Sequence, residues 1–256
     1  GITLALIFEK PSTRTKLSFE AAVTQLGGGA ISLGTSDSQM SRGETLADTA
    51  RVVSRYADVI VFRTFGHDRL EELARAATVP VINGLSDRAH PVQLLADLMT
   101  VEEKLGKIAE NTYAFVGDGT SNMAASWIEA AELFDLDLRI GCPRAFAPIV
   151  SSKNVTLYES AQDAVKGADV VITDVWTSMG QESEHPYRQS ALGQYQVNRE
   201  LLSLASRRAI VMHCLPAHRG EEITDDVVDG PQSVVLDEAE NRLHAQKALL
   251  EILCQK

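Results

Sequence analysis

Short, continuously apolar segments rich in valine and isoleucine recur along this chain and alternate with segments of helical periodicity. Segments of the first kind are typical of parallel strands that are buried on both faces. We expect such strands at 2–8, 30–33, 58–62, 80–83, 113–116, 137–141, 169–173, 209–213 and 233–236. Amphipathic helices are expected at 16–26, 46–56, 69–77, 92–104, 123–134, 160–165 and 239–255.

Strands that alternate with helices indicate parallel sheets whose two faces are covered by helices. Nine expected strands are many for one sheet in a chain of 256 residues, because sheets usually hold about four to six strands. We therefore predict an α/β protein with two domains, each a parallel β-sheet flanked by helices. The first domain is expected at 1–105, the second at 106–238, and a terminal helix at 239–256 that packs back toward the first domain.

The charge balance narrows the classes of function. The chain carries 24 basic and 35 acidic residues, a net charge of −11, which disfavours extended contact with nucleic acid or an anionic membrane.

The three cysteines are too few and wrongly spaced for a disulfide framework, so we expect a reducing, cytoplasmic compartment. No apolar run approaches the ~18 residues of a membrane span. Because Gly1 leads almost directly into a strand, we expect that a leading segment is missing or was processed away.

A phosphate-binding motif is indicated directly after the first expected strand, where Ser12, Thr13, Arg14 and Thr15 open a helical segment. A helix start favours an anion because its backbone N–H groups are unpaired and its dipole is positive there. Hydroxyl groups and a guanidinium add donors that fit phosphate. The alternative is an N-cap residue beside an incidental arginine, and the tetrapeptide alone leaves both interpretations open.

The glycine-rich turn at 117–122 follows a strand and opens a helix, which invites a dinucleotide-binding interpretation. Two features argue against it: Asn122 replaces the third glycine, and the next strand ends in 141–143 without the expected ribose-binding acid. We favour a small-molecule site in which Asn122 points into a cleft.

Further polar groups stand where apolar strands end or helices begin. Arg63 ends one strand, His90 and Gln93 open a helix, and Asp174 starts the segment 174–180 after a buried strand. Each has a plain structural alternative, as a helix start, a capping residue or an internal ion pair. Arg242, in the terminal helix, is also consistent with an ordinary surface residue.

The segment 213–216 places His213 and Cys214 together after a strand. Its spacing fits no standard zinc pattern, so we expect no metal. A Cys–His hydrolase is conceivable on composition, but no oxyanion-hole motif accompanies the pair.

Taken together and in this order, the motifs at 12–15, 90–93, 174–180 and 213–216 resemble the aspartate/ornithine carbamoyltransferase family over essentially the whole chain. The first two mark carbamoyl phosphate binding across that family, and the last two mark its ornithine branch. The resemblance implies transfer of the carbamoyl group of carbamoyl phosphate to the δ-amine of L-ornithine, giving L-citrulline and phosphate. It implies direct attack in a cleft between the two domains, without a covalent enzyme intermediate, metal or cofactor.

The resemblance also implies roles for individual residues, in a homotrimer whose active sites are shared between subunits. The implied catalytic residues are Arg63, His90 and Cys214. The implied carbamoyl phosphate ligands are Ser12, Thr13, Arg14, Thr15, Gln39 (from the neighbouring subunit), Arg63, His90, Gln93, Cys214, Leu215 and Arg242. The implied ornithine ligands are Asn122, Asp174, Ser178 and Met179.

Two departures and several alternatives accompany this resemblance. The family begins with a helical segment before the first strand, and that segment is absent from this sequence. Lys16 stands where the family motif usually has arginine, which keeps the charge but loses the planar fork. Within the enzyme class, the alternative is a carbamoyltransferase for a related amine such as putrescine or an acylated ornithine. Outside it, the alternatives are a non-catalytic carbamoyl-phosphate-binding homologue and a dinucleotide oxidoreductase.

Overall fold

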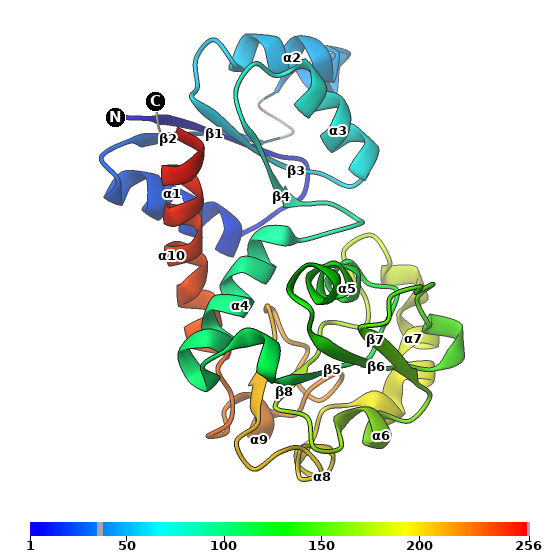
Figure 1. Ribbon diagram of the computed structural model, residues 1–256. Helices are drawn as coiled ribbons and strands as arrows, with labels where there is room; N and C mark the ends of the chain where they lie inside the picture. The colour runs from blue at the N-terminus through cyan, green and yellow to red at the C-terminus, as the bar shows by residue number, and fades with distance from the viewer. Residues whose placement is uncertain (35–37, 255–256) are drawn as a thin grey trace. The chain divides into compact units, whose positions relative to one another are not determined.

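Two parallel β-sheets organise the chain in a computed structural model that describes residues 1–34 and 38–254 (Figure 1). One sheet belongs to a unit formed by Gly1–Ala96 and the chain from Glu240 onward, and the other to a unit formed by Asp97–Ala239. Helices flank each sheet. The predicted fold class, α/β with two helix-flanked parallel sheets, is confirmed.

The sheet of the first unit has the strand order β2-β1-β3-β4. Its strands are β1 (Thr3–Phe8), β2 (Gly29–Gly34), β3 (Val59–Arg63) and β4 (Val81–Leu85). Its helices are α1 (Arg14–Gln25), α2 (Leu46–Val53), α3 (His67–Ala76), the first part of α4 (Pro91–Leu105) and the last part of α10 (Val235–Cys254).

Alternate residues of β1 enter separate hydrophobic clusters of this unit. Leu4 and Leu6 pack with residues of α1 and α10, whereas Ala5 and Ile7 pack with residues of α2 and α3. Successive side chains of a strand point to opposite faces, so the two clusters lie on the two faces of the sheet. The continuous apolar run of β1 is therefore what a strand covered on both sides requires.

The sheet of the second unit has the strand order β7-β6-β5-β8-β9. Its strands are β5 (Thr112–Val116), β6 (Asp137–Gly141), β7 (Val155–Tyr158), β8 (Val170–Ile172) and β9 (Ile210–Met212). Its helices include α5 (Asn122–Phe134), α6 (Ala161–Val165), α7 (His185–Leu192), α8 (Arg199–Leu202) and α9 (Asp225–Val228).

Each sheet has a point where the order of strand addition reverses, between β1 and β3 in one unit and between β5 and β8 in the other. Ligands of open α/β sheets bind outside the carboxyl ends of the strands at such points. In the first unit this edge carries the segment 12–15, Arg63 and the loop that leads to His90. The strand order thus selects which loops form each candidate site.

Two predicted elements are corrected. The strand expected at 233–236 is wrong: Val235 begins α10, and Ser233 makes only an isolated bridge with Val211. A short apolar run is compatible with either a strand or a buried helix start. Strand β7 was not expected, because this edge strand exposes Thr156 and Leu157 and so lacks the continuous apolar signal.

The two units divide inside α4, between Ala96 and Asp97, and inside α10, between Ala239 and Glu240. The expected boundary after residue 105, at the end of the same helix, remains a prediction. None of the helices in the described part of the chain combines the length and apolarity that a membrane crossing requires.

Candidate functional site

The segment 12–15 lies at the start of α1, as the sequence predicts. The Ser12 hydroxyl accepts a hydrogen bond from the Thr15 backbone N–H at 3.3 Å, so Ser12 takes the capping role. Thr13 occupies the N-cap position without a side-chain capping bond. The N-cap interpretation therefore holds for Ser12, and it assigns no role to the side chain of Arg14.

Arg242 joins three predicted site residues of the first unit. One terminal nitrogen of its guanidinium donates to the Thr15 hydroxyl at 2.9 Å. The other donates to the Gln93 carboxamide oxygen and lies 3.3 Å from Nε2 of His90. Only 2% of Arg242 is exposed, so the alternative of an ordinary surface arginine is wrong.

The His90 imidazole is held neutral. Its pKa lies well below the usual value, first because the ring is buried and then because Arg242, Arg63 and Arg14 are close enough to disfavour a second positive charge. Arginine has no acceptor atom, so Nε2 of His90 must accept from Arg242 and the ring proton resides on Nδ1. His90 is therefore a neutral group with an N–H donor.

Arg63 ends β3 and is 7% exposed. Its guanidinium donates to the Gly84 carbonyl at 3.5 Å, which directs the side chain toward the end of β4. Three guanidinium groups and one neutral imidazole thus gather at the carboxyl edge of this sheet. An anion among them would offset the repulsion between the like charges.

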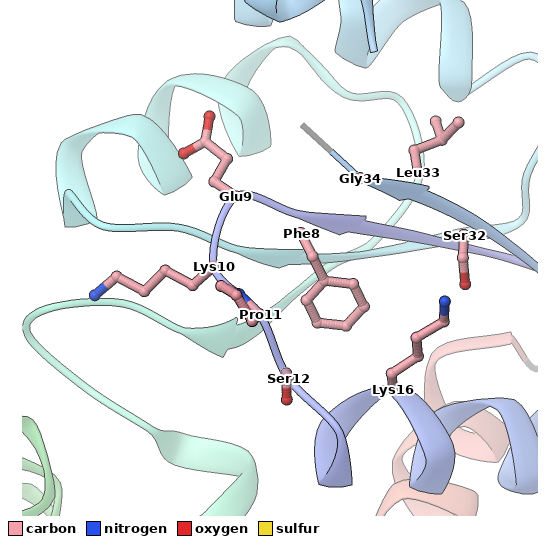
Figure 2. Close-up of a pocket in the computed structure, with 9 residues that line it drawn as sticks. All are labelled: Phe8, Glu9, Lys10, Pro11, Ser12, Lys16, Ser32, Leu33 and Gly34. Carbon is pink, nitrogen blue, oxygen red and sulfur yellow. The ribbon is translucent and has the colours of Figure 1, made fainter. Parts of the chain in front are cut away.

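A pocket of about 240 Å³ opens beside the same loop and is shown in Figure 2. Phe8, Ser12, Lys16 and Ser32 are among its lining residues. Figure 2 shows the Lys16 side chain directed toward the strand that carries Ser32 rather than toward Ser12. Gln39 lies in a short 3-10 turn (Gln39–Arg42) and is exposed, and its role across a subunit boundary remains a prediction.

In the second unit the structure brings Asp174 and Cys214 together. The Cys214 thiol donates to Oδ1 of Asp174 at 3.3 Å. Burial and the nearby Asp174 carboxylate raise the pKa of the thiol well above its usual value, and burial also raises the pKa of Asp174. A nucleophilic cysteine needs a lowered pKa, so these surroundings disfavour a Cys–His hydrolase.

His213 holds the turn that follows Cys214. Its Nδ1 accepts from the Leu215 backbone N–H at 2.9 Å, so its proton lies on Nε2, which donates to Oε1 of Glu222 at 3.0 Å. Leu215 has a φ of 56°, a left-handed conformation that is costly for this residue type and needs such support. Asp174, His213 and Cys214 each place a candidate metal-ligand atom within 4.8 Å of the others, but hydrogen bonds within the chain engage all three. That no metal takes part remains a prediction.

The glycine-rich turn at 117–122 is packed against its own unit. A Cβ on Gly119 would lie 2.7 Å from the Phe146 carbonyl oxygen, and one on Gly117, whose φ is 129°, would lie 3.3 Å from Nε1 of Trp176. The glycines therefore permit close packing of neighbouring chain segments. In a dinucleotide site such glycines let a pyrophosphate approach, so this packing argues against the oxidoreductase alternative.

The remaining predicted ornithine ligands lie on two loops of the second unit. Asn122 is the first residue of α5, behind the N-cap Ser121. Ser178 and Met179 lie between β8 and α7, where the Ser178 N–H donates to the Gln181 carboxamide at 3.1 Å and Met179 is 48% exposed. The structure thus joins Asp174 with Cys214, whereas Ser178 and Met179 occupy a more exposed loop.

The sequence did not indicate Arg188, which connects these two loops. Its guanidinium donates to Asp118 at 2.6 Å and to the Trp176 carbonyl at 3.0 Å, and the residue is 7% exposed. It links the turn before Asn122 to the segment that follows Asp174. The only sequence signal was an arginine on a short helix, which is common on protein surfaces.

Two family models together match nearly all of the chain. The aspartate/ornithine carbamoyltransferase carbamoyl-P binding domain matches residues 1–103, and the Asp/Orn binding domain of the same family matches residues 109–253. The chain belongs to the aspartate/ornithine carbamoyltransferase family.

Relatives of this carbamoyltransferase-family member are similar over most of their length. An ornithine carbamoyltransferase of Rhodopseudomonas palustris (strain BisA53) is 56% identical, with 98% of this chain and 82% of the relative covered. One of Halorhodospira halophila is 54% identical, with 99% and 86% covered. The solved ornithine carbamoyltransferase from Pyrococcus furiosus is 50% identical with a TM-score of 0.94, covering 99% of this chain and 85% of that chain.

The environment of Cys214 predicts slow alkylation. Because the raised pKa leaves little thiolate at pH 8, iodoacetamide should modify Cys214 on the order of tenfold or more slowly in the folded protein than in the urea-unfolded chain. Peptide mass spectrometry across pH 7–10.5 measures the rate for each cysteine. A folded-state profile with its midpoint at or below that of the unfolded chain would contradict the assignment of a protonated thiol.

Proposed function

We propose that this chain transfers the carbamoyl group of carbamoyl phosphate to the δ-amine of L-ornithine, giving L-citrulline and phosphate. The observation that carries the proposal is the gathering of Arg14, Arg63 and Arg242 around a neutral His90 at the carboxyl edge of one sheet. That arrangement suits a doubly charged ligand that also presents a carbonyl group. The ornithine carbamoyltransferases that match nearly the whole chain support the same acceptor.

The phosphate end of carbamoyl phosphate is assigned to the start of α1. Arg14 and the hydroxyl groups of Ser12, Thr13 and Thr15 supply donors where the helix dipole already favours negative charge. Charge grows on the phosphate oxygen as its bond to the carbonyl carbon breaks. Donors that are fixed before the reaction stabilise this charge without reorganisation.

The carbamoyl end is assigned to Arg63, His90 and Gln93. A neutral His90 with its proton on Nδ1 donates to the carbonyl oxygen and adds no further positive charge beside the guanidinium groups. Arg63 adds a charged donor to the oxyanion that forms on attack. Gln93 accepts from Arg242 through its carboxamide oxygen, and its amide N–H₂ group is a donor by type. We assign Cys214 and Leu215 of the same chain to this set. Gln39 of a neighbouring subunit completes it.

The acceptor is assigned to the second unit. Asp174 suits the α-ammonium group of ornithine, with Asn122, Ser178 and Met179 around the amino acid. The Cys214 thiol and the Leu215 carbonyl lie at the turn that would steer the δ-amine. Transfer requires the two sets of residues to converge on one pair of substrates, and the predicted cleft between the domains would provide this.

The chemistry needs no covalent enzyme intermediate, because carbamoyl phosphate already carries a good leaving group. The lone pair of the neutral δ-amine attacks the carbonyl carbon, and the C–O bond breaks with its electron pair passing to the phosphate oxygen. The departing phosphate takes up the proton that the amine nitrogen releases. Holding both substrates in this geometry can lower the barrier by about 7–11 kcal/mol. Cys214 remains a thiol throughout, consistent with a positioning contact rather than attack by sulfur.

We further propose a homotrimer with shared active sites, a cytoplasmic location, and a role in arginine biosynthesis or the urea cycle. Gln39 would then reach the neighbouring site from its exposed turn. These finer proposals follow from the family resemblance. Light scattering of the purified chain tests the trimer directly.

The proposed reaction is tested by its dependence on the acceptor. Phosphate release from carbamoyl phosphate should require L-ornithine and should match citrulline formation one to one. A panel with putrescine and N-acetylornithine tests the alternative acceptors, and we expect ornithine to have the highest kcat/KM. Thermal stabilisation by carbamoyl phosphate without turnover of any acceptor would instead indicate a non-catalytic homologue.

Arg14→Ala should lower kcat/KM on the order of 100- to 1,000-fold, because it removes a charged donor from the phosphate. The melting temperature should change little, since Arg14 is not part of either hydrophobic cluster of its unit. Lys16→Ala is the matched control, two positions along the same helix and exposed, and we expect less than about a threefold effect. Unchanged kinetics in Arg14→Ala would remove this residue from the site.

The pH dependence of kcat/KM should follow the ionisation of the ornithine δ-amine and not that of His90. A lysine-like amine has a pKa near ~10.4, so about one in a few thousand is neutral at pH 7. We expect kcat/KM for ornithine to rise steadily between pH 7 and 9. Because the pKa of His90 lies well below its usual value, no histidine limb should appear near pH 6.5. A flat profile over pH 7–9 would count against rate-limiting attack by a free amine.

A further inference from the structure

Glu9, the first residue after β1, forms a side-on ion pair with Arg69 and is not among the proposed substrate ligands. Its carboxylate accepts from Nε of Arg69 at 3.1 Å and from a terminal nitrogen of Arg69 at 2.5 Å. The Thr64 hydroxyl donates to the same carboxylate. The Glu9 side chain is 10% exposed, against 43% for Arg69, so the carboxylate is shielded from water while the guanidinium is partly solvated.

This pair connects loops that carry the proposed carbamoyl phosphate ligands. Glu9 precedes Ser12 by three positions, and its backbone N–H donates to the Arg63 carbonyl at 2.8 Å. Thr64 directly follows Arg63. The carboxylate of Glu9 thus ties the start of the phosphate loop to the end of β3.

The helix that supplies Arg69 also holds the third loop of this edge. In the first turn of α3, His67 donates its backbone N–H to Asp87 at 2.9 Å and its Nδ1 lies 2.8 Å from the Ser86 hydroxyl. Residues 86–89 lead directly to His90. One helix start is therefore fastened to the loops that follow β1, β3 and β4.

Glu9 is among the residues that line the pocket, and Figure 2 shows its carboxylate directed away from Ser12. A carboxylate that faced the phosphate would repel it, whereas one that faces Arg69 does not. The hydrogen bond to Glu9 is the main reason that the pKa of Arg69 is raised. Removing Arg69 leaves the shielded Glu9 carboxylate poorly compensated, and removing the Glu9 charge releases Arg69 to solvent, so either change frees the loop to shift.

We propose that Glu9 is a positioning residue: through Arg69 and Thr64 it sets the place of the phosphate loop relative to Arg63, and so controls affinity for carbamoyl phosphate without touching it. The inference rests on the proposed function of this edge. It assigns to Glu9, Thr64 and Arg69 a role in binding that their chemistry alone would not suggest.

Glu9→Gln keeps the size of the side chain and removes its charge, and Arg69→Met breaks the pair from the other side. Each should raise the KM for carbamoyl phosphate on the order of 10- to 100-fold, since displacing a donor group by about 1 Å has effects of that size. The KM for ornithine and kcat should change much less. The double variant should have a KM for carbamoyl phosphate no higher than that of the worse single variant, because both substitutions remove the same interaction.

Arg75→Met is the matched control, since Arg75 lies on the same helix in an exposed pair with Glu71 (76% and 54% exposed), and it should leave the KM unchanged. Thr64→Val gives a second approach if Glu9→Gln does not fold. A merely structural role would lower the melting temperature with the KM for carbamoyl phosphate unchanged, and that result would overturn the proposal. If the wild-type chain releases no phosphate with any acceptor, the proposed function fails instead.

Discussion

The guanidinium group of Arg242 is the constraint on which the first candidate site depends. It contacts residues of α1 and α4 from a third helix, α10, and it does so almost completely buried. Hydrogen bonds that involve a charged group contribute about 1.5–3 kcal/mol each, so three such contacts fix the geometry strongly. They also determine a protonation state, because a donor-only partner forces His90 to present its proton on Nδ1.

The two candidate sites share an electrostatic pattern. Arginine supplies permanent positive charge in the first unit, while His90 and Cys214 are kept in neutral forms by burial and by their neighbours. Neutral donors beside fixed charges give a preorganised environment for an oxyanion. Neither His90 nor Cys214 is a strong base in these forms, so the proposed reaction starts from an amine that is already neutral.

Much of the fold followed from the sequence because both sheets are parallel and buried. β1, β3 and β5 are continuous apolar runs, and such runs carry a strong signal. The half-exposed edge strand β7 lacks that signal, and the apolar residues near Val235 begin a helix where a strand was expected. Periodicity over four residues cannot separate these cases, since tertiary packing decides them.

Residues of the candidate sites were predictable from the sequence only where the residue type itself indicates a binding or catalytic role. Arg14, His90 and Asp174 are recognisable as chemical groups at strand ends and helix starts, and the resemblance assigned them together. Glu9 and Arg188 act through contacts with residues that lie 60 and 70 positions away. No local pattern encodes such partners, although Glu9 stands only three positions before Ser12.

The partnership of Thr15 with Arg242 spans 227 positions, and this has a consequence for synthesis on the ribosome. At about 5–20 residues per second, roughly 10–45 s pass between the emergence of the two partners. Once β4 has emerged, the nascent chain holds the whole sheet of its first unit but still lacks the guanidinium that joins Thr15, Gln93 and His90. The Arg242 guanidinium therefore emerges only after the strands of both sheets have been made.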